Sequence, residues 1–188
     1  MNQIKNTYLS FKTRGFYKTI IAIFNHLMSF LCKKFGKQYS LKNIYNFKMY
    51  LDNFDKGISR TLILYGEREL EHKLMLERVL KPGMSVLDIG ANIGYYALIE
   101  LSLIGKNGNL IAVEPSKQNI NLLTKNLVLN GYHNVEIHNK AISDINGYKK
   151  LYMSHMSNLN TFHNSNDKGL NLSGRKISVN TSTILEIR

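Results

Sequence analysis

The stretch VLDIGANIGYY contains several glycine and polar residues that could together bind a ligand. An apolar run ends in Asp88, and a turn spaced by small and polar residues follows it: Gly90, Asn92 and Gly94. Glycine lets the backbone approach a ligand closely, and asparagine tolerates the positive φ angle common in such turns. A second carboxylate, Glu114, ends the next apolar run and suits hydrogen bonding to both hydroxyls of a ribose.

The acid beside this turn discriminates between two classes of cofactor. A dinucleotide places its pyrophosphate on a helix N-terminus and favours the spacing G-x-G-x-x-G, whereas here the glycines read G-x-x-x-G. The Asp88 carboxylate would repel a pyrophosphate, but it would attract the ammonium and sulfonium groups of S-adenosylmethionine. We therefore expect S-adenosylmethionine as the cofactor. An NAD-binding domain is the alternative, and a cofactor titration would separate the two.

The segments around the turn alternate between strands and helices. Three apolar runs predict strands and two longer stretches predict helices: 85–89, 109–115 and 134–139 for the strands, 91–105 and 116–131 for the helices. This order predicts a βαβαβ unit with parallel strands, which is half of a doubly wound sheet. Because adjacent parallel strands end on the same side, we expect Asp88, Glu114 and Asn139 to face one crevice.

The flanking segments are less regular. We predict a short strand over 61–65 and a helix over 66–80, which Pro82 and Gly83 would end. Strands are also predicted over 147–153 and 175–181. The polar stretch between them is long for a connection without secondary structure, which is typical of a functional or mobile loop.

Positive charge is concentrated in the first 60 residues, where 11 Lys and Arg stand against two acids. Residues 11–35 predict a helix, with Phe16, Ile20, Phe24 and Leu27 at helical spacing. Its apolar centre of 14 residues is short of the about 20 that a membrane span needs. Lysines on both sides permit peripheral membrane contact through residues 11–37, and they equally permit a helix docked on the main domain.

Composition and length predict one domain with an extension. We expect a basic helical extension over 1–60 and a partial cofactor-binding domain over 61–188. A single cysteine, Cys32, and the absence of a signal-peptide pattern favour a cytoplasmic setting. No metal site is expected, because paired histidine and cysteine spacings are lacking.

The segments KPGMSVLDIGANIGYY, AVEPS and HNKAISDINGYKKLY resemble the FkbM-type S-adenosylmethionine-dependent methyltransferases, over about residues 65–187. The resemblance implies an α/β fold, with the Rossmann-like doubly wound sheet of the class I methyltransferases. It also implies O-methylation of a sugar or another hydroxyl on a small molecule or glycan. It also implies that the cofactor is contacted by Asp88, Gly90, Ala91, Asn92, Gly94, Glu114, Asn139 and Ala141. Asn139 and Ala141 would lie near its adenine.

The same resemblance implies further strands beyond Arg188, which would supply residues facing the transferred methyl group. We therefore expect a C-terminally truncated domain and assign no catalytic residue, although His155 and His163 lie in the polar loop as candidate bases. The exposed strand edge at 86–88 predicts poor solubility, a homo-oligomer, or cover from strands within 147–181.

Two other functions remain as alternatives. The first is a non-catalytic remnant that still binds the cofactor. The second is a nucleic-acid methyltransferase, which the basic N-terminal third suggests. The absence of an Asn-Pro-Pro-Tyr-type motif for a flipped base argues against nucleic acid as a partner.

Overall fold

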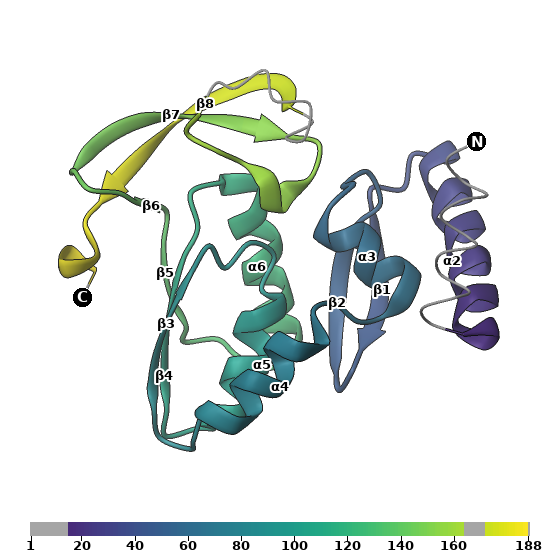
Figure 1. Cartoon of the computed structure of the whole chain (residues 1–188), viewed down its shortest axis with the longest axis horizontal. Helices are drawn as coiled ribbons and strands as arrows, with labels where there is room; N and C mark the ends of the chain where they lie inside the picture. The colour runs from purple at the N-terminus through teal and green to yellow at the C-terminus, as the bar shows by residue number, and fades with distance from the viewer. Residues whose placement is uncertain (1–14, 164–171, 188) are drawn as a thin grey trace.

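The computed structural model describes residues 15–163 and 172–187, which form three small sheets with helices packed among them (Figure 1). The central sheet is parallel, with the order β3-β4-β5: β3 (Ser85–Ile89), β4 (Asn109–Val113) and β5 (Glu136–His138). Helices α5 (Tyr95–Ile104) and α6 (Lys117–Leu129) connect these strands. The predicted βαβαβ unit is confirmed.

Both connecting helices lie on the same face of the parallel sheet (Figure 1). Leu110 and Ala112 of β4 pack into the core on that face, together with Leu98 of α5 and Leu123 of α6. Within the described residues, β3 pairs only with β4, so its other edge is open. Ile89, at the end of β3, leaves 48% of its surface exposed.

Helix α3 (Ile58–Tyr65) replaces the strand that the sequence predicts over 61–65. A short apolar run of this kind fits a strand and a buried helix equally well, so periodicity alone could not decide. Ile58 and Leu62 are one helical turn apart and are both buried in the main core. The left-handed Gly66 ends the helix. The expected domain division at residue 60 therefore falls inside an element of the main core.

A hairpin that the sequence did not predict precedes α3, formed by β1 (Tyr39–Ile44) and β2 (Phe47–Asp52). Two side-chain amides of α6 hold its free edge. Asn126 accepts from Tyr50 N (2.7 Å) and donates to Tyr50 O (3.2 Å), while Asn130 does the same for Lys48 N (3.0 Å) and O (2.7 Å). Asn126 and Asn130 are four residues apart, a rise of about 6 Å in a helix, and Lys48 and Tyr50 are two residues apart, a rise of about 6.7 Å in a strand. The spacing of the two amides therefore matches the spacing of the two backbone positions that they bind.

The third sheet is formed by the C-terminal strands in the order β6-β8-β7: β6 (Ala141–Ile142), β8 (Leu172–Ser182) and β7 (Gly147–Ser154). Ala141, Leu151 and Val179 form its own small core. The strands predicted over 147–153 and 175–181 are confirmed, although this sheet does not pair with β3. Two short 3-10 helices, η1 (Ser157–Leu159) and η2 (Ile184–Glu186), complete the segment.

Two further helices flank the core. Helix α4 (Leu70–Val79) lies within the stretch predicted over 66–80, and α2 (Phe16–Lys34) lies within the stretch predicted over 11–35, of which residues 11–14 are outside the described residues. Helix α2 contacts α3 at the end of the molecule opposite the parallel sheet (Figure 1). No helix in the described part of the chain is long and apolar enough to cross a membrane.

Candidate cofactor-binding site

The turn after β3 adopts the backbone conformation that its residue types predict. Gly90, Asn92 and Gly94 have φ angles of +85°, +51° and +87°. Gly90 N and Ala91 N both donate to Val113 O, at 2.8 and 3.1 Å, so the turn is fixed to the end of β4. The alternation of left-handed residues is therefore held by main-chain hydrogen bonds from the neighbouring strand.

The surroundings of the two glycines in the turn differ. A Cβ atom on Gly94 would lie 2.7 Å from Leu123 Cδ1, so glycine here allows α5 to pack closely on α6. A Cβ atom on Gly90 would meet nothing within 4 Å. The space beside Gly90 is open, and it forms part of a cavity.

Glu114 ties the turn to the start of α6. Its side chain is buried, and one oxygen, Oε2, accepts from Asn92 N at 3.0 Å. The other, Oε1, accepts from Ser116 N (2.9 Å) and from Asn119 Nδ2 (3.1 Å). Burial raises the pKa of Glu114, and these hydrogen bonds oppose that rise. A carboxylate has about four acceptor positions, so Glu114 can still accept a ligand hydroxyl.

A cavity of about 350 Å³ opens beside this turn, which is within the usual range for small-molecule sites. Four of the eight sequence-predicted cofactor residues line it: Gly90, Ala91, Asn92 and Glu114. Most of the remaining wall comes from three segments to which the sequence analysis assigned no cofactor contact: Arg68 and Glu69 before α4, Tyr95 and Tyr96 of α5, and Ser157, Asn158 and Asn160 around η1. Ile58, Pro115 and Leu151 complete the wall.

The other four predicted residues lie outside the cavity. Gly94 packs between the helices as described, and Ala141 is buried in the small C-terminal core. Asn139 Nδ2 donates to Glu114 O (3.1 Å) and to Pro115 O (2.9 Å), so it joins the ends of β4 and β5. Asp88 does not line the cavity, and its Oδ2 is buried without a hydrogen-bond partner among the described residues.

Asp88, which is half-buried, interacts electrostatically with the buried acids Glu100 and Glu114. Burial, and then the charge of Glu114, raises the pKa of Asp88 to about 6. Burial, and then the charge of Asp88, raises the pKa of Glu100 to about 8. At pH 7 the Asp88 carboxyl is mostly ionised and the Glu100 carboxyl is mostly protonated, so the negative charge next to the turn that favours a cationic ligand comes from Asp88.

The rim of the cavity is held by two tyrosines. Tyr95 Oη donates to Arg68 O at 2.9 Å and accepts from Arg68 N at 3.2 Å, while Tyr96 Oη donates to the Glu69 carboxylate. Their place directly after Gly94 in the sequence is the signal that could have identified them. Arg68 and Glu69 come 27 residues earlier in the chain than their partners, so no local pattern indicates them.

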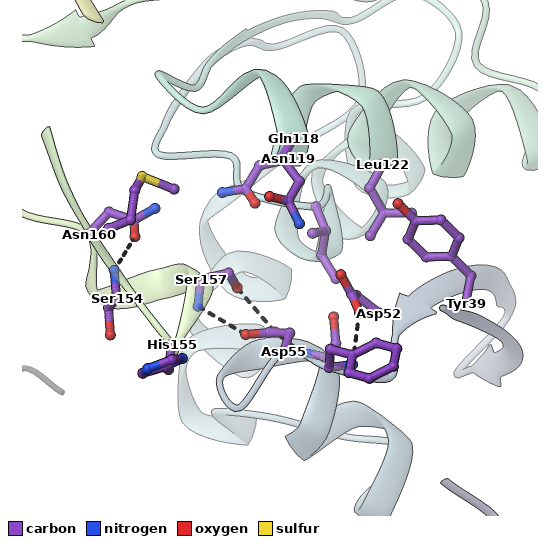
Figure 2. Close-up of a pocket in the computed structure, with 14 residues that line it drawn as sticks. Tyr39, Asp52, Asp55, Gln118, Asn119, Leu122, Ser154, His155, Ser157 and Asn160 are labelled. Atoms are coloured by element: carbon purple, nitrogen blue, oxygen red, sulfur yellow. Dashed lines mark hydrogen bonds between the residues drawn. The ribbon is translucent and has the colours of Figure 1, made fainter. Parts of the chain in front are cut away.

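A second cavity of about 190 Å³ adjoins the first, and Ser157 and Asn160 line both (Figure 2). Asp52, Asp55 and His155 also line the second cavity, whereas the other candidate base, His163, lines neither. Figure 2 shows Asp55 and Ser157 joined by two hydrogen bonds, from Ser157 N (2.9 Å) and from Ser157 Oγ (3.1 Å).

The parallel sheet, the glycine turn and the paired strand-end acids define a Rossmann-like methyltransferase of class I. Residues 49–152, more than half of the chain, match the family model for protein-L-isoaspartate(D-aspartate) O-methyltransferase. The chain belongs to this family.

Curated relatives match over a shorter segment. The chain is 40% identical over 58 residues to protein-L-isoaspartate O-methyltransferase of Methanococcus vannielii, which covers 31% of this chain and 28% of that protein. The corresponding protein of Methanosarcina mazei is 41% identical over 58 residues, which covers 31% of this chain and 24% of that protein. The chain thus matches only about a quarter of the length of these relatives.

Solved structures are similar over part of the chain. A protein-L-isoaspartate O-methyltransferase aligns with a TM-score of 0.35 and 26% identity, covering 38% of this chain and 23% of that chain. The TYW2 protein of P. horikoshii, solved in complex with MeSAdo, aligns with a TM-score of 0.44 and 16% identity, covering 64% and 54%.

The comparisons confirm the methyltransferase class and S-adenosylmethionine as the cofactor of the family. They match a different family from the FkbM-type group that the motifs resemble. Two of the three motifs that carry the resemblance lie at the ends of β3 and β4, where the sequence predicts contacts to the cofactor and not to the acceptor. A motif in this region therefore indicates the cofactor more strongly than the acceptor.

Proposed function

We propose that the chain binds S-adenosylmethionine in the 350 Å³ cavity and transfers its methyl group to an oxygen of an acceptor. The observation that carries this proposal is the convergence of the Gly90–Asn92 turn and Glu114 on one cavity. The family name supports the carboxylate of an isoaspartyl residue in a protein as the first acceptor to test.

The residues present fit this cofactor in three respects. The open space beside Gly90 admits a ligand close to the backbone, and Glu114 retains acceptor capacity for one ribose hydroxyl. The ionised Asp88 carboxylate favours the ammonium and sulfonium charges. When bound, S-adenosylmethionine supplies an electrophilic methyl group on sulfur.

The chain's own contribution is to position the acceptor oxygen and to exclude water. The second cavity is a suitable place for the acceptor, because Ser157 and Asn160 separate it from the first. A carboxylate acceptor is ionised near neutral pH and needs no base, whereas a hydroxyl acceptor needs one. His155 on the second cavity favours a sugar or other hydroxyl as the second candidate acceptor.

Calorimetric titration with S-adenosylmethionine tests the cofactor site. Asn158 lines the cavity and is exposed, so Asn158→Trp should fill space there with little effect on folding and should weaken binding by roughly tenfold or more. Asn134→Trp, at an exposed position outside the cavity, is the matched control and should bind normally. A folded wild-type chain that gives no binding would refute the proposal.

Methyl transfer to an isoaspartyl peptide, with the aspartyl peptide as the control, tests the acceptor. With a carboxylate acceptor, which needs no base, His155→Gln should retain activity. With a hydroxyl acceptor, which needs a base, activity should fall in His155→Gln. Cofactor binding without transfer to peptide, glycan or RNA acceptors would identify a non-catalytic remnant.

A further inference from the structure

An ordinary surface helix turns its large apolar residues towards the protein body, but helix α2 turns them outwards. Small and polar residues face the protein body: Thr19 and Ala22 are buried, and Asn25 Nδ2 donates to Leu64 O at 3.3 Å. Ser29 Oγ donates to Asn53 Oδ1 at 3.5 Å. The core therefore takes up little of this helix's apolar surface.

Large apolar side chains lie on the opposite side, which we call the outer face of α2. It consists of Ile20, Ile23, Phe24, Leu27 and Phe30, and each of these side chains is about half exposed or more, up to 61% for Phe24. Phe35, just beyond the helix, is 80% exposed. Contiguous apolar surface of this kind on a single helix marks an interaction site.

The charged side chains of this segment have one sign, and one of them, Lys18, pairs with Glu67 at 2.8 Å. Residues 15–51 contain six lysines and no acidic residue, and Lys34 and Lys37 flank Phe35 at the end of the helix. A second copy of the chain on this face would bring two such basic segments together, and the repulsion would oppose a dimer. An anionic lipid surface would complement both the charge and the apolar residues.

We propose that α2 is a membrane-interface helix, which lies along an anionic bilayer with its outer face in the boundary between headgroups and acyl chains. Its place at the end of the molecule opposite the parallel sheet would leave the 350 Å³ cavity accessible to solvent (Figure 1). This proposal is independent of the methyltransferase activity, because it rests on residues outside both cavities.

Co-sedimentation of the full chain with vesicles tests the proposal. Vesicles of phosphatidylcholine with phosphatidylglycerol should retain the chain, and phosphatidylcholine alone should retain much less. Phe24→Ser/Leu27→Ser should lower partitioning at least about tenfold, because two large apolar side chains leave the interface. Ile145→Ser/Tyr148→Ser, at exposed apolar positions outside α2, is the matched control and should partition like the wild type.

Charge and self-association provide two further measurements. Lys34→Gln/Lys37→Gln should lower binding to anionic vesicles several-fold with little change on neutral ones, and about 1 M salt should do the same. Equal thermal melting of all variants shows that they are folded. Equal partitioning of the wild type and Phe24→Ser/Leu27→Ser would overturn the proposal. It would also be overturned if the wild type were an oligomer that this variant made monomeric while neither bound vesicles.

Discussion

Asp55 holds the segment around η1 against the start of α3, and its replacement by asparagine should loosen one wall of both cavities. Its carboxylate accepts four hydrogen bonds. Two come from Gly57 N (2.9 Å) and Ser59 N (2.8 Å) at the start of α3. Two come from Ser157, which is 102 residues away in the sequence. Ser157 Oγ also contacts Asn92 Oδ1 at 3.4 Å, so the wall reaches the glycine turn.

Asparagine keeps one acceptor oxygen. With its amide nitrogen in the Oδ2 position only Ser59 N loses its partner, because the Ser157 hydroxyl can accept instead, whereas the opposite orientation leaves both Gly57 N and Ser157 N without one. At about 1.5 kcal/mol for each hydrogen bond to a charged group, the Asp55→Asn change should cost about 1.5–3 kcal/mol in the free energy of unfolding. Ser157→Ala loses only the hydroxyl and should cost about 1 kcal/mol. Urea unfolding followed by circular dichroism measures both.

Gly57→Ala separates the contact with η1 from the cap of α3, because it leaves Asp55 unchanged. A Cβ atom on Gly57 would lie 2.4 Å from Asn158 Oδ1 and 3.0 Å from Ser157 N, so the η1 segment must move away. We expect weaker binding of S-adenosylmethionine in both Asp55→Asn and Gly57→Ala. If Asp55→Asn costs less than about 0.5 kcal/mol, a value typical of neutral surface changes, Asp55 does not hold this wall.

Three further changes test the core beneath the site. Because the pKa values of Asp88 and Glu100 are raised to about 6 and about 8, the folded chain binds more protons than the unfolded chain over this range, and stability should fall as pH rises from about 5 to about 8. Glu100→Gln should remove about 2–4 kcal/mol of this loss, and an unchanged pH profile of urea unfolding would contradict it. Gly94→Ala should cost about 2–3 kcal/mol, because the new side chain strains the left-handed backbone and contacts Leu123, and the melting temperature should fall. Gly105→Ala is the control: its φ angle is also positive but its Cβ would meet nothing, so it should show only the smaller, backbone part of this fall. Asn126→Ala should cost about 3 kcal/mol in urea unfolding, because the buried amide makes three hydrogen bonds to backbone groups; a loss below about 1 kcal/mol would show that water replaces them.

The βαβαβ unit and its turn could be predicted from the sequence because their signals are local. The apolar run of 85–89 gives β3 with the predicted bounds, and Asn92 has the positive φ that its position in the turn suggested. Ser116 caps α6, since its Oγ accepts from Asn119 N at 3.4 Å. Each of these features depends on residues fewer than six apart.

The parts that could not be predicted depend on contacts between distant segments. The hairpin edge is held by Asn126 and Asn130, about 80 residues away, and no pattern in 39–52 indicates that partner. Arg68 and Glu69 reach the cavity through hydrogen bonds to Tyr95 and Tyr96. Asp88 does not line the cavity, because its carboxyl points into the fold, where its Oδ2 has no hydrogen-bond partner among the described residues.

The amides of α6 that hold the hairpin also determine where this protein can aggregate. An uncovered strand edge is a template on which another chain can add a strand. Asn126 and Asn130 occupy the outward backbone groups of β2, so that edge is closed to a passing strand. The free edge of β3 has no such cover within the described residues. Intermolecular strand addition in concentrated solution should therefore start at edges such as that of β3 and not at β2, and loss of both asparagines would open a further growth point on the hairpin.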